Sequence, residues 1–416
     1  MSKKVLIVSY IFPPKSGIGG RRWAKFSKYL NRLDVDLKVL TFQKKNDANF
    51  SNWSKDIVEY ENKIERIKPI QPYFLKDSSP KTIFGKVKYH MSLLYWKNKY
   101  NGNYYDETVA MQSQIFGLLE KYYLLGYNNI IITSAPFLLS YFGALFKEKY
   151  PQCNLITDFR DPWTNNEMGY QYRFLPSNRL DYEKKIEKFT INQSNIVYTV
   201  NQTMANYFSG LITNQDVSIK VLNNGFDKED FVPVSSSNKH HPNRIRFVYA
   251  GAIYEQTEYV LEPFFDAINQ LSVLPGIQDE ISFNFYCDIN NKYKSKISNC
   301  NLVKIAAPVS LSEIHQIIEA NDICMLFLTR DMKDSFSTKF YEYIFHKKFI
   351  VVFSEKGETG NFVEENHLGI HISPHEIYNK LYDIIANPSY IKFNKEFNSN
   401  IFEVGNIAKN INNDLL

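Results

Sequence analysis

The chain has 416 residues, of which 44% are hydrophobic and 22% are charged. One hydrophobic core rarely extends beyond roughly 250 to 300 residues, so we expect two domains of about 200 residues each. The formal net charge of +5 is small for this length and gives no indication of nucleic acid as a partner. The four cysteines are widely spaced and contain no CxxC pair, which indicates neither disulfides nor zinc and fits a reducing, cytoplasmic environment.

The N-terminus passes from MSKK directly into the apolar run VLIVSY, which is too short for a signal peptide. The longest apolar region, residues 130–146, is interrupted by Thr133, Ser134 and Pro136. It therefore predicts a strand, a turn and a helix rather than a membrane span, and we expect a soluble protein.

The first half alternates apolar runs with helical periodicity, which is typical of a parallel sheet covered by helices. In residues 21–33, Trp23, Phe26, Leu30 and Leu33 share one helical face, whereas Lys25 points elsewhere. The apolar runs that predict buried strands are KVLIVSY (4–10), DLKVLTF (36–42), NNIIITS (128–134), NLITDF (154–159) and NIVYTV (195–200).

The second half repeats this alternation after the polar segment 232–243, which predicts a linker. The segment SLSEIHQIIEA begins with a capping box of Ser310 and Glu313 and predicts a helix. The predicted strands are RFVYAGAI (246–253), ISFNFYCD (281–288), NLVKIAA (301–307), DICMLFL (322–328), KFIVVF (348–353) and LGIHI (368–372). We therefore predict an α/β fold of two Rossmann-like, doubly wound domains that face a cleft, with site residues directly after strands.

The stretch PPKSGIGGRRW, residues 13–23, follows the first strand and precedes a helix. Gly19 and Gly20 would let a phosphate approach the free amides of the helix start, and Arg21 and Arg22 add positive charge. The alternative is a tight turn with two solvated arginines. Because Arg22 replaces the third glycine of G-x-G-x-x-G and no acid closes the second strand, NAD is not expected.

The stretch TDFRDPW, residues 157–163, places Asp158 and Asp161 around Arg160 at the end of a strand. Such a group can bind sugar hydroxyls, hold an arginine near a phosphate or supply a catalytic base. The alternative is a structural ion pair that closes the loop.

The stretch DSFSTKFYEYIFHKKFIVV, residues 334–352, predicts a helix that begins near Ser337. Its positive end would hold a diphosphate with Ser337, Thr338 and Lys339, while Glu342 could accept two hydrogen bonds from a ribose diol. The alternative for Glu342 is an ordinary exposed helix acid. SEKGETGNFVEE, from residue 354, offers a second anion-binding wall or a flexible turn.

In this order, the segments GIGGRRW, DFRDPW, NNGFD (223–227), FVYAGAI and STKFYEYIFHKKFIVV resemble the retaining glycosyltransferases of family 4, also called glycosyl transferases group 1. The resemblance covers nearly the whole chain and implies the two-domain GT-B fold. It implies an acceptor-side domain at 1–220, a sugar-nucleotide-binding domain at 221–390 and a C-terminal helix within 391–416 that crosses back to the first domain.

The resemblance also implies which residues bind the donor, a UDP- or GDP-linked sugar. Glu342 would bind the ribose, and the loop from Ser337 to Lys339 would face the diphosphate. The other implied donor contacts are Gly19, Gly20, Arg21, Arg22, Gly251 and Asp334. The chain departs from the family at Asp334, where a glutamate is usual, and at AIYEQT (252–257), where a basic pair is usual. Lys339 or Arg330 would then compensate.

The expected activity is therefore a metal-independent, hexosyltransferase-like glycosyltransferase of bacterial cell-surface polysaccharide biosynthesis. It would need no cofactor and would use a glycan or lipid-linked acceptor, with Asp158, Arg160 and Asp161 as catalytic candidates. Two alternatives are a sugar-nucleotide epimerase of the same fold and a non-catalytic sugar-nucleotide-binding protein.

Residues 76–105 mix lysines with aromatic and aliphatic residues at helical spacing. This pattern suits the surface of an anionic membrane, which would place a cytoplasmic protein on the inner face of the membrane. The plainer alternative is an amphipathic helix packed on the sheet.

Overall fold

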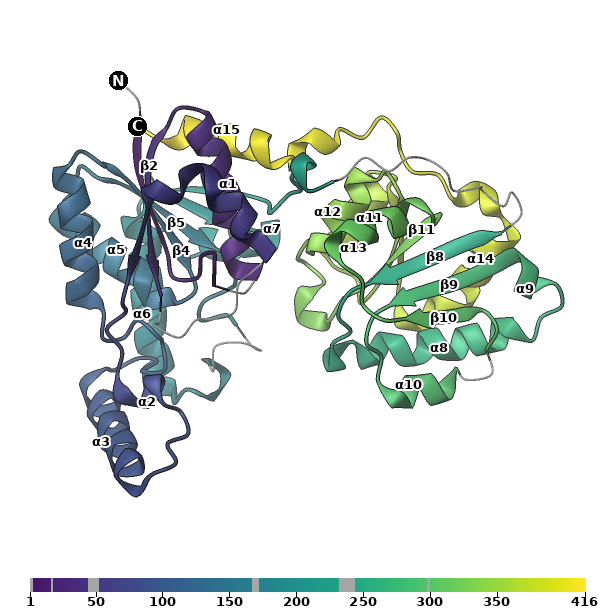
Figure 1. Cartoon of the computed structure of the whole chain (residues 1–416), viewed down its shortest axis with the longest axis horizontal. Helices are drawn as coiled ribbons and strands as arrows, with labels where there is room; N and C mark the ends of the chain where they lie inside the picture. Colours follow the sequence, from purple (N-terminus) through teal and green to yellow (C-terminus); the bar gives the residue numbers. More distant parts are fainter. Residues whose placement is uncertain (1–2, 16–17, 44–51, 167–171, 232–243, 298–299) are drawn as a thin grey trace. The chain divides into compact units, whose positions relative to one another are not determined.

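A computed structural model describes residues 3–15, 18–43, 52–166, 172–231, 244–297 and 300–416 (Figure 1). The chain divides into two compact units, which we call the N-terminal unit (residues 1–223 and 404–416) and the C-terminal unit (residues 224–403). The predicted linker at 232–243 lies outside the described residues. Each unit is a parallel sheet covered by helices, which confirms the prediction of two doubly wound α/β domains.

The N-terminal unit contains seven parallel strands in the order β3-β2-β1-β4-β5-β6-β7. Their bounds are β1 Lys4–Ser9, β2 Asp36–Phe42, β3 Ile64–Ile67, β4 Asn129–Ser134, β5 Asn154–Phe159, β6 Ile196–Thr199 and β7 Ser218–Val221. The α-helices are α1 Arg21–Arg32, α2 Tyr73–Lys76, α3 Ile83–Lys99, α4 Gln112–Leu124, α5 Phe137–Lys149, α6 Ser177–Gln193, α7 Gln202–Ser209 and α15 Val404–Asp414. Short 3-10 segments include η1 Ile18–Gly20 and η2 Asn52–Lys63.

Two cores cover the two faces of this sheet. Alternate residues of β1 point to opposite faces, so Val5 and Ile7 pack with α1 and α15, whereas Leu6 and Val8 pack with α4 to α7. Helix α1 is buried on more than its predicted apolar face because η2 also covers it. Lys25, which we predicted to point away from the core, is buried and forms a salt bridge with Asp56 of η2 at 3.1 Å.

The C-terminal unit contains six parallel strands in the order β10-β9-β8-β11-β12-β13. Their bounds are β8 Ile245–Ala250, β9 Ile281–Tyr286, β10 Val303–Ala306, β11 Ile323–Phe327, β12 Phe349–Phe353 and β13 Gly369–Ile372. The α-helices are α8 Glu258–Ser272, α9 Ile277–Glu280, α10 Asn291–Lys296, α11 Leu311–Glu319, α12 Thr338–Phe345, α13 Glu358–Glu365 and α14 Ile377–Ala386, and 3-10 segments include η4 Lys228–Asp230 and η6 Arg330–Met332. Helices α8 and α14 cover one face, and α11, α12 and α13 cover the other.

Both sheets reverse their strand order beside a central strand, between β1 and β4 and between β8 and β11. In doubly wound sheets the loops after these strands separate, and ligands bind at the carboxyl ends of the strands there. The loops that follow β1, β4, β8 and β11 therefore position the candidate sites. Within the described residues, no helix is both long and apolar enough to cross a membrane.

Candidate functional site

The glycine loop after β1 brings backbone segments into close contact. A Cβ atom on Gly20 would lie 3.1 Å from the carbonyl oxygen of Ile11, and a Cβ atom on Gly19 would lie 2.1 Å from Nη1 of Arg160. A side chain at Gly20 would press on the backbone of Ile11 and Phe12, whereas one at Gly19 would displace the guanidinium of Arg160. Residues 16 and 17 of the predicted loop lie outside the described residues.

The start of α1 carries a buried salt bridge. Nη2 of Arg22 donates to Oδ1 of Asp158 at 2.9 Å and to the carbonyl oxygen of Leu222 at 2.7 Å. The other oxygen of Asp158 accepts hydrogen bonds from Trp23 Nε1 at 2.7 Å and Thr133 Oγ1 at 2.9 Å. An arginine at a helix N-terminus opposes the helix dipole, and the carboxylate of Asp158 offsets that unfavourable placement.

The sequence led us to expect Asp158 beside Arg160, but in the structure the two side chains are not neighbours. Asp158 is inside β5 and faces the α1 side of the sheet with Ile156, whereas Arg160 follows the end of the strand. Arg160 instead donates from Nε to the carbonyl oxygen of Ser134 at 2.8 Å and from Nη2 to that of Ala135 at 3.3 Å. Asp161 is half-buried in the same loop. Arg160, which follows β5, thus contacts both the loop after β4 and the glycine loop after β1.

The two arginines of the glycine loop have different surroundings. Arg22 is buried against Asp158, whereas the guanidinium of Arg21 stacks over the ring of Trp53 at 4.0 Å from its centroid. Such a cation–π contact holds the guanidinium beside the loop. The loop therefore places Arg21 against an aromatic ring and Arg22 against a carboxylate.

In the C-terminal unit, the loop after β8 makes room for a lysine. Gly251 has a φ of +134°, and a Cβ atom there would lie 2.2 Å from Cε and 2.7 Å from Nζ of Lys339. The ammonium lies 5.4 Å from the centroid of the Tyr249 ring. Burial lowers the pKa of Lys339, while Glu342 raises it by a smaller amount. Among the described residues, none forms a salt bridge with Lys339.

Helix α12 begins where the sequence predicted. Ser337 is its N-cap, and its Oγ accepts a hydrogen bond from the amide of Phe340 at 3.4 Å. Thr338 and Lys339 form the first turn, and Glu342 lies one turn further along, half-buried. Arg330, our other candidate to replace the missing basic pair, is held elsewhere by a 2.7 Å salt bridge with Glu355.

Asp334 has a local structural partner. Its Oδ1 accepts a hydrogen bond from the amide of Glu358 at 2.8 Å, so Asp334 caps the first turn of α13. The next amide, that of Thr359, donates to the carbonyl oxygen of Lys333 at 3.1 Å. The loop before α12 thus accepts hydrogen bonds from two amides at the start of α13, and Asp334 links the two helices.

No sequence pattern indicated Glu183, a buried carboxyl on α6. It accepts hydrogen bonds from Trp163 Nε1 at 2.9 Å, the amide of Asn103 at 2.7 Å and Tyr100 OH at 3.2 Å. Burial raises the pKa of Glu183 to about 7, although these hydrogen bonds lower it in part. Glu183 connects the segment after α3 to the loop after β5, and only the proximity of these distant segments in the fold reveals it.

We expect Glu183→Gln to change how stability depends on pH. The folded carboxyl holds its proton up to about pH 7, and the unfolded one releases it near 4.5, so Glu183 makes the N-terminal unit less stable as the pH rises between these values. The variant should lose this dependence, worth at most about 3 kcal/mol. Urea unfolding at about pH 5 and about pH 8 measures it by tryptophan fluorescence. Identical pH slopes for Glu183→Gln, the wild type and the exposed control Glu148→Gln would contradict this result.

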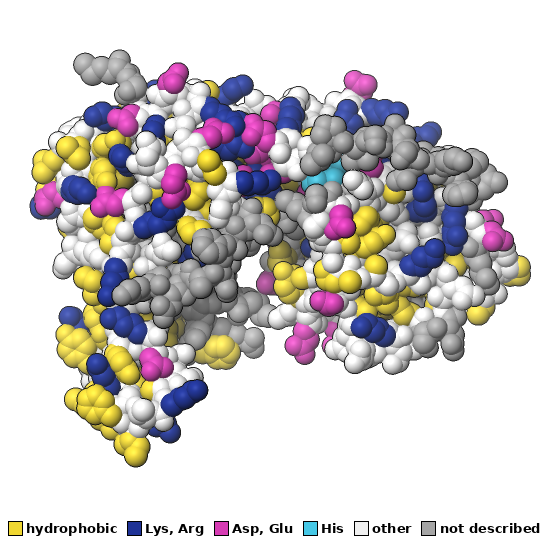
Figure 2. Space-filling model, viewed as in Figure 1, with side chains coloured by type: hydrophobic (Ala, Val, Ile, Leu, Met, Phe, Trp, Pro, Cys, Tyr) yellow, Lys and Arg dark blue, Asp and Glu magenta, His cyan; other side chains and the backbone are white. Residues whose placement is uncertain are grey.

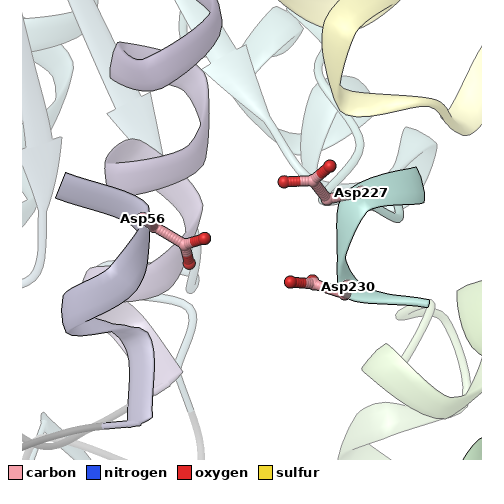
Figure 3. A group of neighbouring side chains, drawn as sticks. All are labelled: Asp56, Asp227 and Asp230. Carbon is pink, nitrogen blue, oxygen red and sulfur yellow. The ribbon is translucent and has the colours of Figure 1, made fainter. Parts of the chain in front are cut away.

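Three aspartates drawn in Figure 3 belong to different units and are two separate features. Asp56 lies in η2 of the N-terminal unit and pairs with Lys25. In the C-terminal unit, Asp230 is the last residue of η4 and Asp227 is its N-cap, which accepts a hydrogen bond from the amide of Glu229 at 3.0 Å. Asp56 and Asp227 therefore each have a partner within their own unit.

No protein-family model matches the sequence, and no curated protein matches it. Solved structures do match over nearly the full length. The UDP-GlcNAc 2-epimerase of Neisseria meningitidis, solved with UDP-GlcNAc, is 13% identical, with a TM-score of 0.56 and coverage of 99% of both chains. The N-terminal domain of trehalose-6-phosphate phosphatase of Candida albicans is 11% identical, with a TM-score of 0.58 and coverage of 100% of this chain and 93% of that one.

A Listeria monocytogenes protein assigned as a UDP-N-acetylglucosamine 2-epimerase is 9% identical, with a TM-score of 0.53, and the match covers 99% of this chain and 95% of that chain. These identities are low, so the matches establish the architecture alone. The chain therefore has the two-domain, GT-B-like fold of these epimerases, as its sequence predicted.

Proposed function

We propose that this chain is an enzyme of nucleotide-linked sugars and that its C-terminal unit binds the nucleoside diphosphate. The observation that carries the proposal is the environment of the Lys339 ammonium. The ammonium is partly desolvated, it lies against Gly251 at the end of a central strand, and no described residue forms a salt bridge with it. A partly buried cation without a salt bridge is unfavourable, and a phosphate anion would compensate for it.

The surroundings of Lys339 suit a diphosphate. Lys339 belongs to the first turn of α12, where backbone amides and the helix dipole favour negative charge. Glu342 follows one turn later and would accept hydrogen bonds from a ribose diol. The loops after β8 and β11 flank the position where this sheet reverses its order, which is the usual ligand site of such sheets.

The first candidate reaction is sugar transfer. The oxygen of an acceptor hydroxyl bonds to the anomeric carbon as the bond from that carbon to the diphosphate breaks. The hydroxyl proton passes to solvent, and the nucleoside diphosphate leaves. Positive charge around the diphosphate would stabilise this leaving group without a metal. The order of the family 4 motifs supports this reaction, with retention of configuration, a glycan or lipid-linked acceptor and a role in bacterial cell-surface polysaccharide. Asp161, half-buried after β5, is then the candidate for an acceptor contact.

The second candidate reaction is epimerisation of the sugar. It inverts one carbon of the nucleotide-linked sugar and requires an acid and a base at that carbon, but no acceptor. The two epimerase structures that match nearly the full chain favour this candidate. A third possibility, sugar-nucleotide binding without turnover, shares the same C-terminal site.

One assay separates these possibilities. The purified chain is incubated with UDP- and GDP-linked sugars, with and without glycan and lipid-linked acceptors, and the products are followed by mass spectrometry and proton NMR. Transfer or donor hydrolysis releases a nucleoside diphosphate, whereas epimerisation gives a product of unchanged mass with new sugar resonances. Binding without either product indicates the non-catalytic alternative. Failure of every UDP and GDP compound to bind would overturn the whole proposal.

Glu342→Gln is expected to weaken nucleotide binding by about 10-fold or more, because hydrogen bonds to a charged acceptor exceed those to an amide by about 1.4 kcal/mol or more. Calorimetric titration with UDP and GDP measures this. The matched control is Glu365→Gln, an exposed glutamate at the end of α13 in the same unit. Equal affinities of Glu342→Gln and the wild type would remove Glu342 from the site.

A further inference from the structure

Helix α3 presents a stripe of apolar side chains to solvent. The exposed fractions are 84% for Ile83, 79% for Phe84, 51% for Val87, 67% for Met91, 57% for Leu94 and 55% for Tyr95. Successive helical residues are rotated by about 100°, so these six side chains fall within an arc of roughly 120° on one face. Scattered exposed apolar residues are ordinary, but a continuous stripe of this kind marks an interaction surface.

The opposite face of α3 already packs on the protein. Trp96 lies against the core of the N-terminal unit, and Tyr89 makes an edge-to-face contact with Phe74 at 6.3 Å between ring centroids. Gly85 is buried on the same side. Helix α3 is therefore anchored by one apolar face and retains a second one. The exposed stripe is not explained by the packing of the helix.

Basic side chains border the exposed stripe on both sides. They are Lys86, Lys88, His90, Lys97 and Lys99. At about 100° per residue, Lys88 and Lys99 follow one edge of the stripe and the other three follow the opposite edge. The sequence contains no acidic residue between Asp77 and Asp106. The whole α3 segment is thus positively charged around an apolar centre.

We propose that α3 lies on a membrane surface that contains anionic lipid headgroups. An apolar stripe flanked by lysines is the arrangement of helices that lie in the membrane interface, where apolar side chains enter the acyl boundary and lysines meet phosphates. Figure 1 shows α2 and α3 extending away from the sheet of the N-terminal unit, and Figure 2 shows hydrophobic and basic side chains together on this extension. At 17 residues, α3 offers a contact about 25 Å long. This surface is independent of the nucleotide site.

Vesicle flotation of the full chain tests this proposal. The chain is mixed with vesicles of phosphatidylcholine alone or of phosphatidylcholine with phosphatidylglycerol, at low and high salt. Binding is expected to the anionic vesicles and to weaken with salt. Two variants, the triple change Phe84→Ser, Met91→Ser and Leu94→Ser and the double change Lys86→Glu and Lys97→Glu, should each reduce partitioning by about 10-fold or more.

Matched controls separate the effect from general surface changes. Leu124→Ser removes a side chain that is 76% exposed on α4 of the same unit, and Lys184→Glu reverses an exposed charge on α6. Both should bind vesicles as the wild type does. Failure to bind anionic vesicles, or equal binding by the α3 variants, overturns the proposal. Self-association of the chain is measured as well. If the chain binds no vesicles and the triple change abolishes its self-association, the stripe packs against a second copy of the chain and the proposal is overturned.

Discussion

Asp158→Ala is expected to lower the free energy of unfolding of the N-terminal unit by about 3–5 kcal/mol. The carboxylate is fully buried and holds Arg22, Trp23 and Thr133. Its removal takes a carboxylate away from the buried guanidinium of Arg22 and leaves the hydrogen bond to the carbonyl oxygen of Leu222. A buried charge that loses its partner is far more costly than a broken surface pair.

Tryptophan fluorescence measures this loss in one unit alone. All four tryptophans, Trp23, Trp53, Trp96 and Trp163, belong to the N-terminal unit. Denaturant unfolding followed by their emission therefore reports this unit without a signal from the other. Trp23 is itself hydrogen-bonded to Asp158, so its emission should also change in the folded variant.

Two further variants make the result specific. Asp181→Ala breaks an exposed pair with Lys184 and should change stability by less than about 0.5 kcal/mol. The double change Arg22→Met and Asp158→Asn removes both charges, so its cost should be clearly smaller than the sum of the two single changes. A loss below about 1 kcal/mol for Asp158→Ala would show that this salt bridge does not stabilise the unit.

The central strands were predictable because parallel strands covered on both faces form continuous apolar runs. All eleven predicted strands are present, whereas β3 (IERI) and β7 (SIKV) were missed. Both have four residues, contain charges and lie at the two edges of their sheet, where one neighbour is absent. The edge strand β10 shares these features, but it was predicted because it lies within the longer apolar run NLVKIAA. Their pairing with a neighbouring strand, rather than their own sequence, makes them strands.

The sequence indicated where the candidate residues lie relative to strands and helices, but it did not indicate which residues they contact. The start of α12 at Ser337 follows from local capping chemistry, and it was predicted correctly. The partners of Asp158 and Asp334 lie far away in sequence or on another helix, at Arg22 and Glu358, and no local spacing indicates them. The sequence could not show which face of helix α3 is exposed, because the helix is apolar on two faces and the sequence pattern does not distinguish them.

The proposed nucleotide site yields the second large effect. Lys339→Met is expected to weaken the binding of UDP or GDP by about 100-fold, because a partly desolvated charge contact with the diphosphate is lost. Calorimetric titration measures the affinity. The control is Lys380→Met, an exposed lysine on α14 of the same unit, which should bind nucleotide as the wild type does. Unchanged affinity of Lys339→Met would remove Lys339 from the site.

The pH dependence provides an independent test of the same lysine. Burial lowers the pKa of Lys339, and a bound diphosphate would raise it again by stabilising the charged ammonium. Nucleotide binding should therefore weaken as the pH rises through the lowered pKa of Lys339. The free chain should respond in the opposite direction, because the unfolded lysine holds its proton longer than the folded one, so this group favours folding more as the pH rises.

Gly251→Ala should weaken nucleotide binding through Lys339. A methyl group at Gly251 would collide with Cε and Nζ of Lys339 and displace the ammonium, so we expect a loss of about 10-fold or more in affinity. The positive φ of Gly251 adds strain of about 1–3 kcal/mol, which lowers stability whatever stands at residue 339. In a Lys339→Ala background the collision disappears, so Gly251→Ala should then cost stability but little further affinity. Equal losses of affinity in both backgrounds would show that Gly251 contacts the nucleotide directly, and not through Lys339.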